Sequence, residues 1–174
     1  WKKTPGRDGR VVNVEKSLKK MHRANLFDED MIVYDVVKPD VDFADLEPSP
    51  IYRGHPNKQM VALMINVSWG ENYVPKIIEV LSEHQMKATF FVEGKWAKNF
   101  PELVKLMDEE GHVIGNHAYN HPDMARLSRD EMVKQIEETN HILEALTGKR
   151  PVWFAPPSGS YSMDVVYVAD ELKM

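Results

Sequence analysis

Cysteine is absent from the sequence, and its absence excludes disulfide bonds, a thiolate zinc site and a thiol nucleophile. No apolar run reaches the length of about 20 residues that a membrane-spanning helix needs, and no apolar segment of a signal peptide is present. No block of basic residues stands out and the net charge is −5. We therefore expect neither a membrane span in this chain nor a nucleic-acid partner.

The composition is ordinary for a soluble globular protein, with 43% hydrophobic and 28% charged residues. A length of 174 residues is enough for one domain with a hydrophobic core and an appendage. The first residue is Trp1 rather than methionine, so we expect an upstream segment in the natural protein. The lack of an export signal is therefore only weak evidence against export.

Residues 1–57 differ in pattern from the rest of the chain and predict an N-terminal extension. Proline-containing turns punctuate it, and periodicity predicts a helix near Val14–Arg23 and a strand at Met31–Val37. We expect the extension to enter the main domain, residues 58–174, through Ile51–Gly54. The basic residues of its helix are interpreted as a solvated face; they are Lys16, Lys19, Lys20, His22 and Arg23.

Strands and helices alternate in the main domain. Short apolar runs typical of buried strands lie, in chain order, at Val61–Ile65, Ala88–Val92, Val113–Gly115 and Val152–Phe154. Helical patterns separate them. The first covers Tyr73–Met86, the second starts at Pro101 and ends before Gly111, and the third starts after Ser128 and ends before Gly148. This alternation predicts a parallel sheet or barrel with its chemistry at the carboxyl ends of the strands.

Three segments of interest follow strands and should meet at that edge: Asn66–Gly70, His117–Pro122 and Ala155–Tyr161. Two histidines four residues apart, His117 and His121, are spaced to direct two imidazoles at one ion. Such a site normally has an anionic third ligand that holds the metal and positions a water molecule. The first of the three segments, where that carboxylate is expected, contains no acidic residue.

With these strand ends in view, the main domain resembles the polysaccharide deacetylases of carbohydrate esterase family four, also known as the NodB-homology domain. The resemblance is carried by Ala88–Gly94, Gly111–His117, His121–Pro122 and Phe154–Gly159. It implies a distorted (β/α) barrel of parallel strands surrounded by helices, present here only in its N-terminal part. Later family motifs, including a general-acid histidine, would lie beyond Met174, so we expect a continuation or a separate C-terminal fragment of the same protein.

The resemblance also implies a divalent metal, often zinc, held by two histidines and one aspartate. A second aspartate acts in the family as general base on the water that attacks the acetamide of an N-acetylated sugar, in peptidoglycan or chitin-like glycan. His117 and His121 match the histidine ligands. Asn66 stands at the position of the base, Val67 at that of the metal-binding aspartate, and Ala155 at that of the arginine that orients the base.

These replacements are unfavourable for catalysis. Asn66 cannot accept a proton from water, so general-base assistance, commonly worth about a hundred- to ten-thousand-fold, is lost. Val67 has no lone pair, and catalytic zinc sites normally keep three protein ligands, so we expect zinc to bind weakly if at all. An arginine at position 155 would be an uncompensated charge without its carboxylate. The sequence thus predicts a deacetylase-like protein with little or no activity.

Two other functions stay open. The first is a non-catalytic, glycan- or protein-binding pseudoenzyme of the bacterial cell envelope, since the family implies an extracellular or cell-wall location. The second is a metal-dependent hydrolase in which Glu71 or Glu93 replaces the missing carboxylate. For the substrate groove we select Trp69, Pro156, Pro157 and Tyr161, although Trp69 could equally pack beside the strand end and the two prolines form first of all a rigid turn. His112 is interpreted as a helix C-terminal residue that complements the helix dipole.

Overall fold

The structure is a computed structural model that describes residues 8–41 and 45–174. Trp1, from which an upstream segment was inferred, lies outside the described residues. The chain forms two compact units. One contains the described residues up to Glu47 together with His55–Asn57, and the other contains Pro48–Gly54 together with Lys58–Met174.

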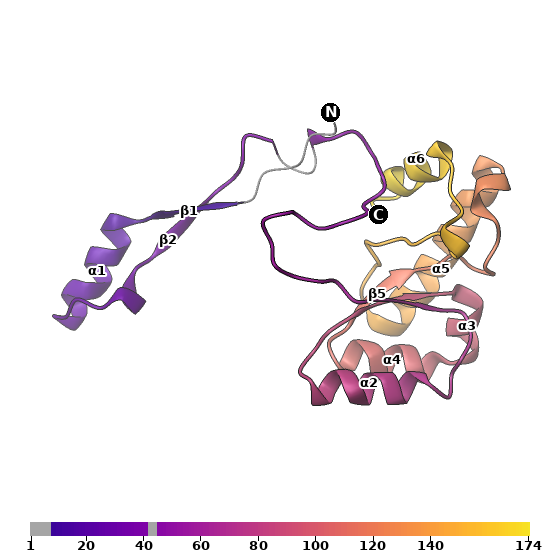
Figure 1. Cartoon of the computed structure of the whole chain (residues 1–174), viewed down its shortest axis with the longest axis horizontal. Coiled ribbons are helices and arrows are strands. Elements are labelled where there is room, and N and C mark those ends of the chain that lie inside the picture. The colour runs from indigo at the N-terminus through magenta and orange to yellow at the C-terminus, as the bar shows by residue number, and fades with distance from the viewer. Residues whose placement is uncertain (1–7, 42–44) are drawn as a thin grey trace. The chain divides into compact units, whose positions relative to one another are not determined.

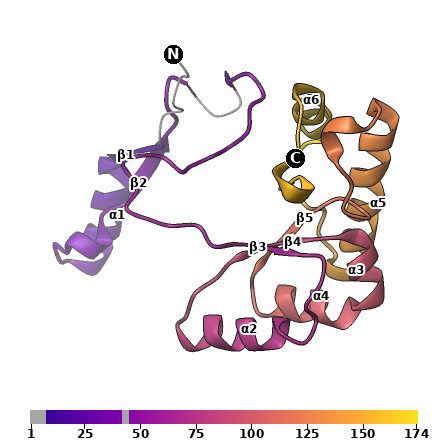
Figure 2. The ribbon, with the colours of Figure 1, turned by 45° about the vertical axis from the view of Figure 1, so that its right-hand side comes forward.

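The N-terminal unit is a two-stranded antiparallel ribbon with a helix between its strands (Figures 1 and 2). Strand β1 (Gly9–Val12) pairs with β2 (Tyr34–Val37), and helix α1 (Val14–Ala24) connects them through the short 3₁₀ helix η1 (Glu29–Met31). The predicted helix is confirmed. The strand predicted at Met31–Val37 starts later than expected, at Tyr34, because η1 extends to Met31. Strand β1 was not predicted.

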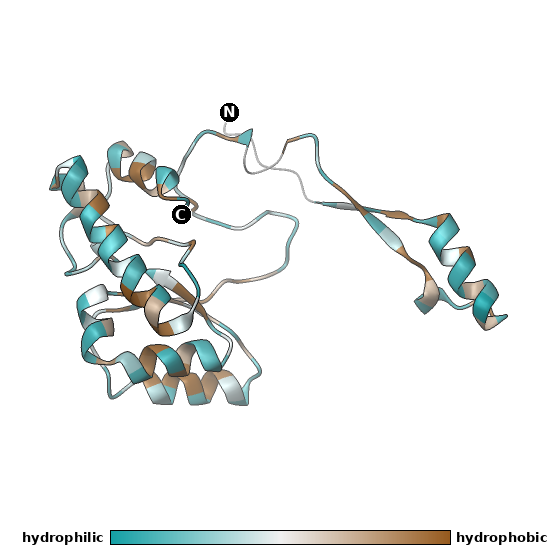
Figure 3. Cartoon of the chain, turned by 180° about the vertical axis from the view of Figure 1, so that it is seen from behind, coloured by the Kyte–Doolittle hydropathy of each residue, from teal (hydrophilic) through white to brown (hydrophobic). Residues whose placement is uncertain are grey.

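Helix α1 starts where the Asn13 side chain accepts a hydrogen bond from the backbone N–H of Lys16, an N-cap that satisfies one of the free donors of the first turn. It ends at Asn25, which adopts the left-handed conformation. Valine side chains are exposed on both strands of the ribbon; these are Val11, Val12, Val36 and Val37. The hydropathy colouring of Figure 3 shows brown, hydrophobic stretches along these strands.

The second unit is built on a parallel sheet in the order β3-β4-β5. Its strands are β3 (Met64–Val67), β4 (Thr89–Val92) and β5 (Val113–Asn116). In this sheet β3 starts at Met64 rather than at Val61, because its ladder begins opposite Thr89 while Val61 is 85% exposed. The predicted α/β class and the parallel strand arrangement are confirmed.

The prediction of a fourth strand at Val152–Phe154 is wrong. Residues 152–154 form only one isolated parallel bridge, between Phe154 and Asn116. Two hydrogen bonds make this link, from Asn116 N–H to the Trp153 carbonyl and from Ala155 N–H to the Asn116 carbonyl. Prolines stand on either side, and proline has no N–H with which to extend a ladder.

The unit contains five α-helices: α2 (Val74–Glu83), α3 (Gly94–Asn99), α4 (Pro101–Glu109), α5 (Arg129–Thr147) and α6 (Met163–Glu171). Helices α2 and α4 lie side by side, and α5 contacts α3, α4, α6 and β5 (Figures 1 and 2). Two short 3₁₀ helices, η3 (Met124–Arg126) and η4 (Pro157–Gly159), follow the strand ends of interest. Sequence patterns had not indicated α3 or α6.

The predicted boundaries of α4 and α5 are confirmed. Pro101 occupies the first turn of α4, and Gly111 beyond its end has φ +75°. A complete capping box between Ser128 and Glu131 opens α5, and Gly148 ends it with φ +72°. These are positions at which local hydrogen bonding or a left-handed backbone decides the structure without help from tertiary contacts.

Two apolar clusters hold the unit together. The first joins the sheet to α2 and α4 through buried side chains that include Ile78, Phe90, Val92, Val104 and Met107. The second joins α5 and α6 to the segment after β5 through side chains that include Ala118, Met124, Met132, Ile136 and Val168. The second cluster therefore packs directly against the histidine segment.

The dipole role predicted for His112 is wrong. The ring is only 5% exposed and packs edge-on against Phe90, and its Nδ1 accepts a hydrogen bond from the Ala88 backbone N–H at 3.2 Å. Burial lowers the pKa of His112, assisted by the nearby charge of Lys87 and opposed by Glu110. His112 is a neutral acceptor for the start of β4, because a protonated ring could not accept that bond.

We expect the free energy of unfolding to fall as the pH is lowered through the ordinary histidine pKa of 6.5. In the window between the lowered pKa and this ordinary value the unfolded chain binds more protons, so acid favours unfolding, by at most about 1.4 kcal/mol per pH unit for one proton. His112→Gln should flatten this dependence in urea unfolding measured at several pH values.

The control is His141→Gln, at a side chain that is 72% exposed. Equal acid sensitivity of His112→Gln and the unchanged chain would contradict the assignment.

Candidate functional site

The sheet register brings the predicted segments to one edge. Val67 is paired with Val92, and Val92 with Asn116. The residues that follow these three positions are Ser68, Glu93 and His117. Because the strands are parallel, the first residues of the three loops emerge together at their carboxyl ends.

His117 is fixed and buried at this edge. It is 1% exposed, and its Nδ1 lies 2.7 Å from the Ala155 carbonyl oxygen. Since a carbonyl only accepts, Nδ1 must carry the proton, which leaves the lone pair on Nε2. Burial lowers the pKa of His117, the hydrogen bond to Ala155 opposes this, and the charge of His121 lowers it further. The ring is thus held neutral, the form that binds metals.

His121 completes the pair from the exposed side. Its ring centroid lies 5.2 Å from that of His117 with an interplanar angle of 70°. The loop between them needs two left-handed residues, Ala118 with φ +61° and His121 with φ +57°. Such backbone is uncommon outside glycine, so neighbouring groups must hold the loop in place.

Asn116 and helix α5 supply that support from one side. The Asn116 side chain is fully buried; its Nδ2 donates to the Ile136 carbonyl and to Asn140 Oδ1, each at 2.8 Å, and its Oδ1 accepts from the Ala118 backbone N–H. Gln135 Oε1 accepts from the next two backbone N–H groups of the loop, those of Tyr119 and Asn120.

Helix α3 supports the loop from the other side. The backbone N–H groups of Gly94 and Lys95 donate to the carbonyls of Ala118 and Tyr119 at 2.9 and 2.8 Å. A Cβ at Gly94 would lie 2.6 Å from Thr139 Oγ1, so a side chain here would push α3, the loop and α5 apart. The histidine loop is therefore rigidly framed by two helices.

The two positions expected to hold carboxylates do not offer them. Asn66 is exposed on β3, and Val67 is 2% exposed within the apolar cluster that contains Val74 and Ile78. Position 67 thus serves packing. Within residues 8–41 and 45–174, no three His, Asp or Glu side chains come together as a metal-ligand set. The two imidazoles suit a divalent cation, but without a third protein ligand the residues present do not fit a catalytic metal centre.

Glu93 is one of the two carboxylates that could replace the missing metal ligand. It is 8% exposed at the end of β4, and its burial raises its pKa, opposed by the charges of His121 and Lys95. It nevertheless forms no ligand set with the histidines in the described part of the chain. Glu71 is half-buried and belongs to no such set either. The rearranged hydrolase site is therefore not supported by this geometry.

The residues selected for the groove differ in exposure. Trp69 is 77% and Tyr161 39% exposed, whereas Pro156 is half-buried and Pro157 is buried. The segment that carries Tyr161 is tied to the histidine loop because Ser160 Oγ donates to Asp123 Oδ1. Exposed aromatic rings on the segments that follow the strand ends are suited to contact a ligand.

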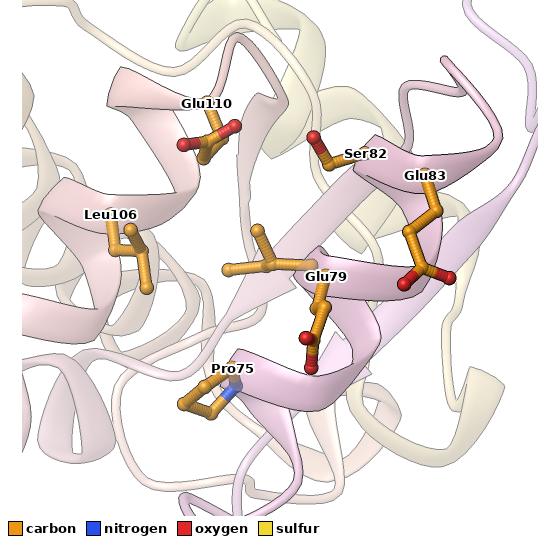
Figure 4. Close-up of a pocket in the computed structure, with 7 residues that line it drawn as sticks. Pro75, Glu79, Ser82, Glu83, Leu106 and Glu110 are labelled. Atoms are coloured by element: carbon orange, nitrogen blue, oxygen red, sulfur yellow. The ribbon is translucent and has the colours of Figure 1, made fainter.

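A separate hollow lies between α2 and α4. Figure 4 shows the carboxylates of Glu79, Glu83 and Glu110 around it, with Pro75 and Leu106 alongside. It includes none of the residues predicted for the site. Since it lacks histidine and any convergent set of reactive groups, the strand edge, rather than this hollow, is the candidate site.

The parallel α/β scaffold carries a framed histidine pair at the carboxyl ends of its strands, where the functional residues of such folds lie. A family model described as polysaccharide deacetylase matches residues 53–174. The chain belongs to the polysaccharide deacetylase family, and its parallel sheet is the N-terminal part of that fold.

Relatives of two kinds are found. The chain is 48% identical to the uncharacterized protein YlxY of Bacillus subtilis over all of its own length and 54% of that protein. It is 44% identical to a peptidoglycan-N-acetylglucosamine deacetylase of Bacillus cereus over 62% of this chain and 39% of the relative. The chain thus spans about half or less of the length of these curated relatives.

A solved structure is similar over nearly the whole chain. The crystal structure of wild-type BA3943 from Bacillus anthracis, described as a CE4 family pseudoenzyme, has 46% identity and a TM-score of 0.81. The match covers 98% of this chain and 60% of that one. A mutant of the same protein is described as having restored enzymatic activity.

Sequence reasoning missed the residues that support the loop. Asn116, Gln135 and Asn140 look like ordinary polar residues of a strand end and a helix. A signal was nevertheless present, since Asn140 falls on the buried face of α5, between Ile136 and Leu143. A buried amide requires hydrogen-bond partners.

None of the helices in the described ranges is long and apolar enough to cross a membrane.

We expect Asn140→Ala to destabilise the unit by about 1–3 kcal/mol, because the buried Nδ2 of Asn116 loses one of its two acceptors. Chemical denaturation measures the change, and the exposed Asn99→Ala is the matched control. A loss no larger than that of the control would show that the Asn116 network does not hold the loop.

Proposed function

We propose that this chain is part of a deacetylase-like protein that binds N-acetylated glycan, such as peptidoglycan or a chitin-like polymer, with little or no ability to hydrolyse it. The observation that carries the proposal is a framed histidine pair at the edge of a sheet whose strand β3 has Asn66 and Val67 where the resemblance implies both acids. Binding requires the shape of the edge and its aromatic rings, whereas hydrolysis also requires a base and a held metal.

The relatives support the choice of ligand and the loss of activity separately. One relative is a peptidoglycan-N-acetylglucosamine deacetylase, which supports peptidoglycan as the glycan and an extracellular, cell-wall location in a bacterium. Another is a CE4 family pseudoenzyme, which supports a degenerate site.

The proposal includes weak binding of a divalent metal, zinc by the chemistry of the donors. Two neutral imidazoles are good zinc ligands, and His117 presents Nε2 without having to lose a proton. The missing anionic ligand removes both an electron donor and charge compensation. Binding through two ligands should therefore be easily reversed by a chelator.

The chain should release acetate from N-acetylglucosamine oligomers at near-background rates, with or without added zinc or cobalt. The loss of the base alone removes about a hundred- to ten-thousand-fold of rate. His117→Ala should leave this background unchanged. Robust turnover that His117→Ala abolishes would contradict the proposal. Isothermal titration with the same oligomers tests binding by itself, and the absence of heat at millimolar concentration would exclude the glycan.

The variant Asn66→Asp with Val67→Asp should bind zinc at least about tenfold more tightly than the unchanged chain. A residue that only hydrogen-bonds a metal ligand already changes metal affinity by about 10- to 100-fold, and a direct ligand should have at least the smaller effect. Because Val67 is 2% exposed, the carboxylate that Val67→Asp introduces is buried. It should lower the melting temperature when a chelator is present, and zinc should restore that temperature. Isothermal titration and thermal unfolding measure the two effects.

Asn66→Asp alone is the control for the added charge, and His117→Ala in the double variant should cancel the gain. Unchanged zinc affinity in the double variant would show that β3 is misaligned with the family motif.

A further inference from the structure

Tyr52 lies outside the part of the chain that the family model matches, which starts at residue 53, yet it contacts the candidate site. Its hydroxyl forms a hydrogen bond with the hydroxyl of Tyr161. The segment Pro48–Gly54 belongs to the same compact unit as the sheet. A residue that precedes the matched domain therefore meets a residue at the end of its last described loop.

We infer that Tyr52 and Tyr161 form an aromatic wall that contacts a sugar ring of the bound glycan. This inference rests on the proposed glycan binding and adds to it a residue that determines specificity. The expected ligand is an extended oligomer of N-acetylated sugars, recognised through the apolar faces of its rings and through its hydroxyl groups.

Exposure alone does not carry this inference, because single exposed apolar residues are normal on protein surfaces. The pairing is the distinguishing feature. Tyr52 is 70% and Tyr161 39% exposed, and their hydroxyl groups bond to each other. Each tyrosine offers a large apolar area on a side chain with two rotatable torsions, so its ordering costs little entropy on binding.

The polar ends of the pair suit a sugar as well. A phenol hydroxyl has one proton and two acceptor lone pairs, so it can both donate and accept. Sugars present donors and acceptors around an apolar ring face, and tyrosine is suited to surfaces where one end of a contact is apolar and the other wet. The wall itself contributes no charge, which fits a neutral glycan.

The wall is connected to the histidines through one short segment. Its start is Ala155, whose carbonyl accepts from His117, and near its end Ser160 bonds to Asp123, two residues after His121. The six steps from Ala155 to Tyr161 span at most about 20 Å. An oligomer can cover such a distance, whereas a single sugar at the histidines need not reach the wall.

The alternative role of the pair is a clamp that fastens Pro48–Gly54 to the domain. The two roles differ in what the Tyr52 ring does, and substitutions separate them. Tyr52→Phe removes the hydroxyl bond and keeps the ring, whereas Tyr52→Ala removes both. If the ring contacts sugar, only the second variant loses most of the affinity.

The test is isothermal titration of the full chain with the N-acetylglucosamine pentamer, with the dimer as the short ligand. We expect Tyr52→Ala to weaken pentamer binding about five- to tenfold, the size typical of removing an important contact residue. Tyr52→Phe should stay within about twofold of the unchanged chain. Tyr34→Ala, at a tyrosine that is 49% exposed in the N-terminal unit, should bind both ligands normally.

Each other outcome is decisive. Unaltered pentamer binding by Tyr52→Ala, or an equal loss in Tyr52→Phe, overturns the aromatic wall while glycan binding stands. If the unchanged chain binds neither oligomer, the proposed function fails and the wall fails with it. Circular dichroism of both Tyr52 variants establishes that they are folded, and the phenylalanine variant keeps the test valid if the alanine variant is not.

Discussion

The hydrogen bonds of Asn116 are the interaction on which the site depends. Its side chain uses both Nδ2 protons and its Oδ1 inside the protein, and its backbone bonds to Trp153 and Ala155. One buried residue thus connects β5, α5, the bridged segment and the loop that carries the histidines. A buried amide that is fully satisfied stabilises one arrangement and makes alternatives costly. The loop can therefore hold left-handed residues at Ala118 and His121.

Seen from this network, the histidine pair does not need a metal to explain its geometry. His117 is fixed by Ala155 on one side, and its ring fills space that is nearly closed to solvent. Its position is a property of the fold, whereas Asn66 and Val67 stand on β3, which β4 separates from β5. The side chains at positions 66 and 67 therefore do not set the position of the His117 ring.

Much of the fold followed from local signals in the sequence. The capping box at Ser128, the glycine after α5 and Pro101 at the start of α4 set boundaries that local physics decides. The start of β3 and the reduction of residues 152–154 to one bridge could not be predicted in this way. Both depend on the partner strand and on its register, which the apolar pattern of one segment does not contain.

The site was predictable in part, and for a similar reason. Spacing and resemblance selected His117 and His121, whose rings do lie together. The supports from α5 were missed because a buried amide has no characteristic spacing along the sequence. The dipole role of His112 was wrong because its acceptor bond to Ala88 depends on a contact across the sheet. Tyr52 was overlooked because it precedes the recognisable motifs and meets Tyr161 only in the folded chain.

The contact of Gly94 with Thr139 has a broader consequence for how such a protein can change over time. A backbone packed this closely leaves no room for a larger side chain. Substitutions that change the conformation of the histidine loop should therefore disrupt its packing between α3 and α5. A new ligand specificity is therefore easier to acquire by substituting aromatic side chains on the surrounding segments than by changing the residues that pack around His117 and His121.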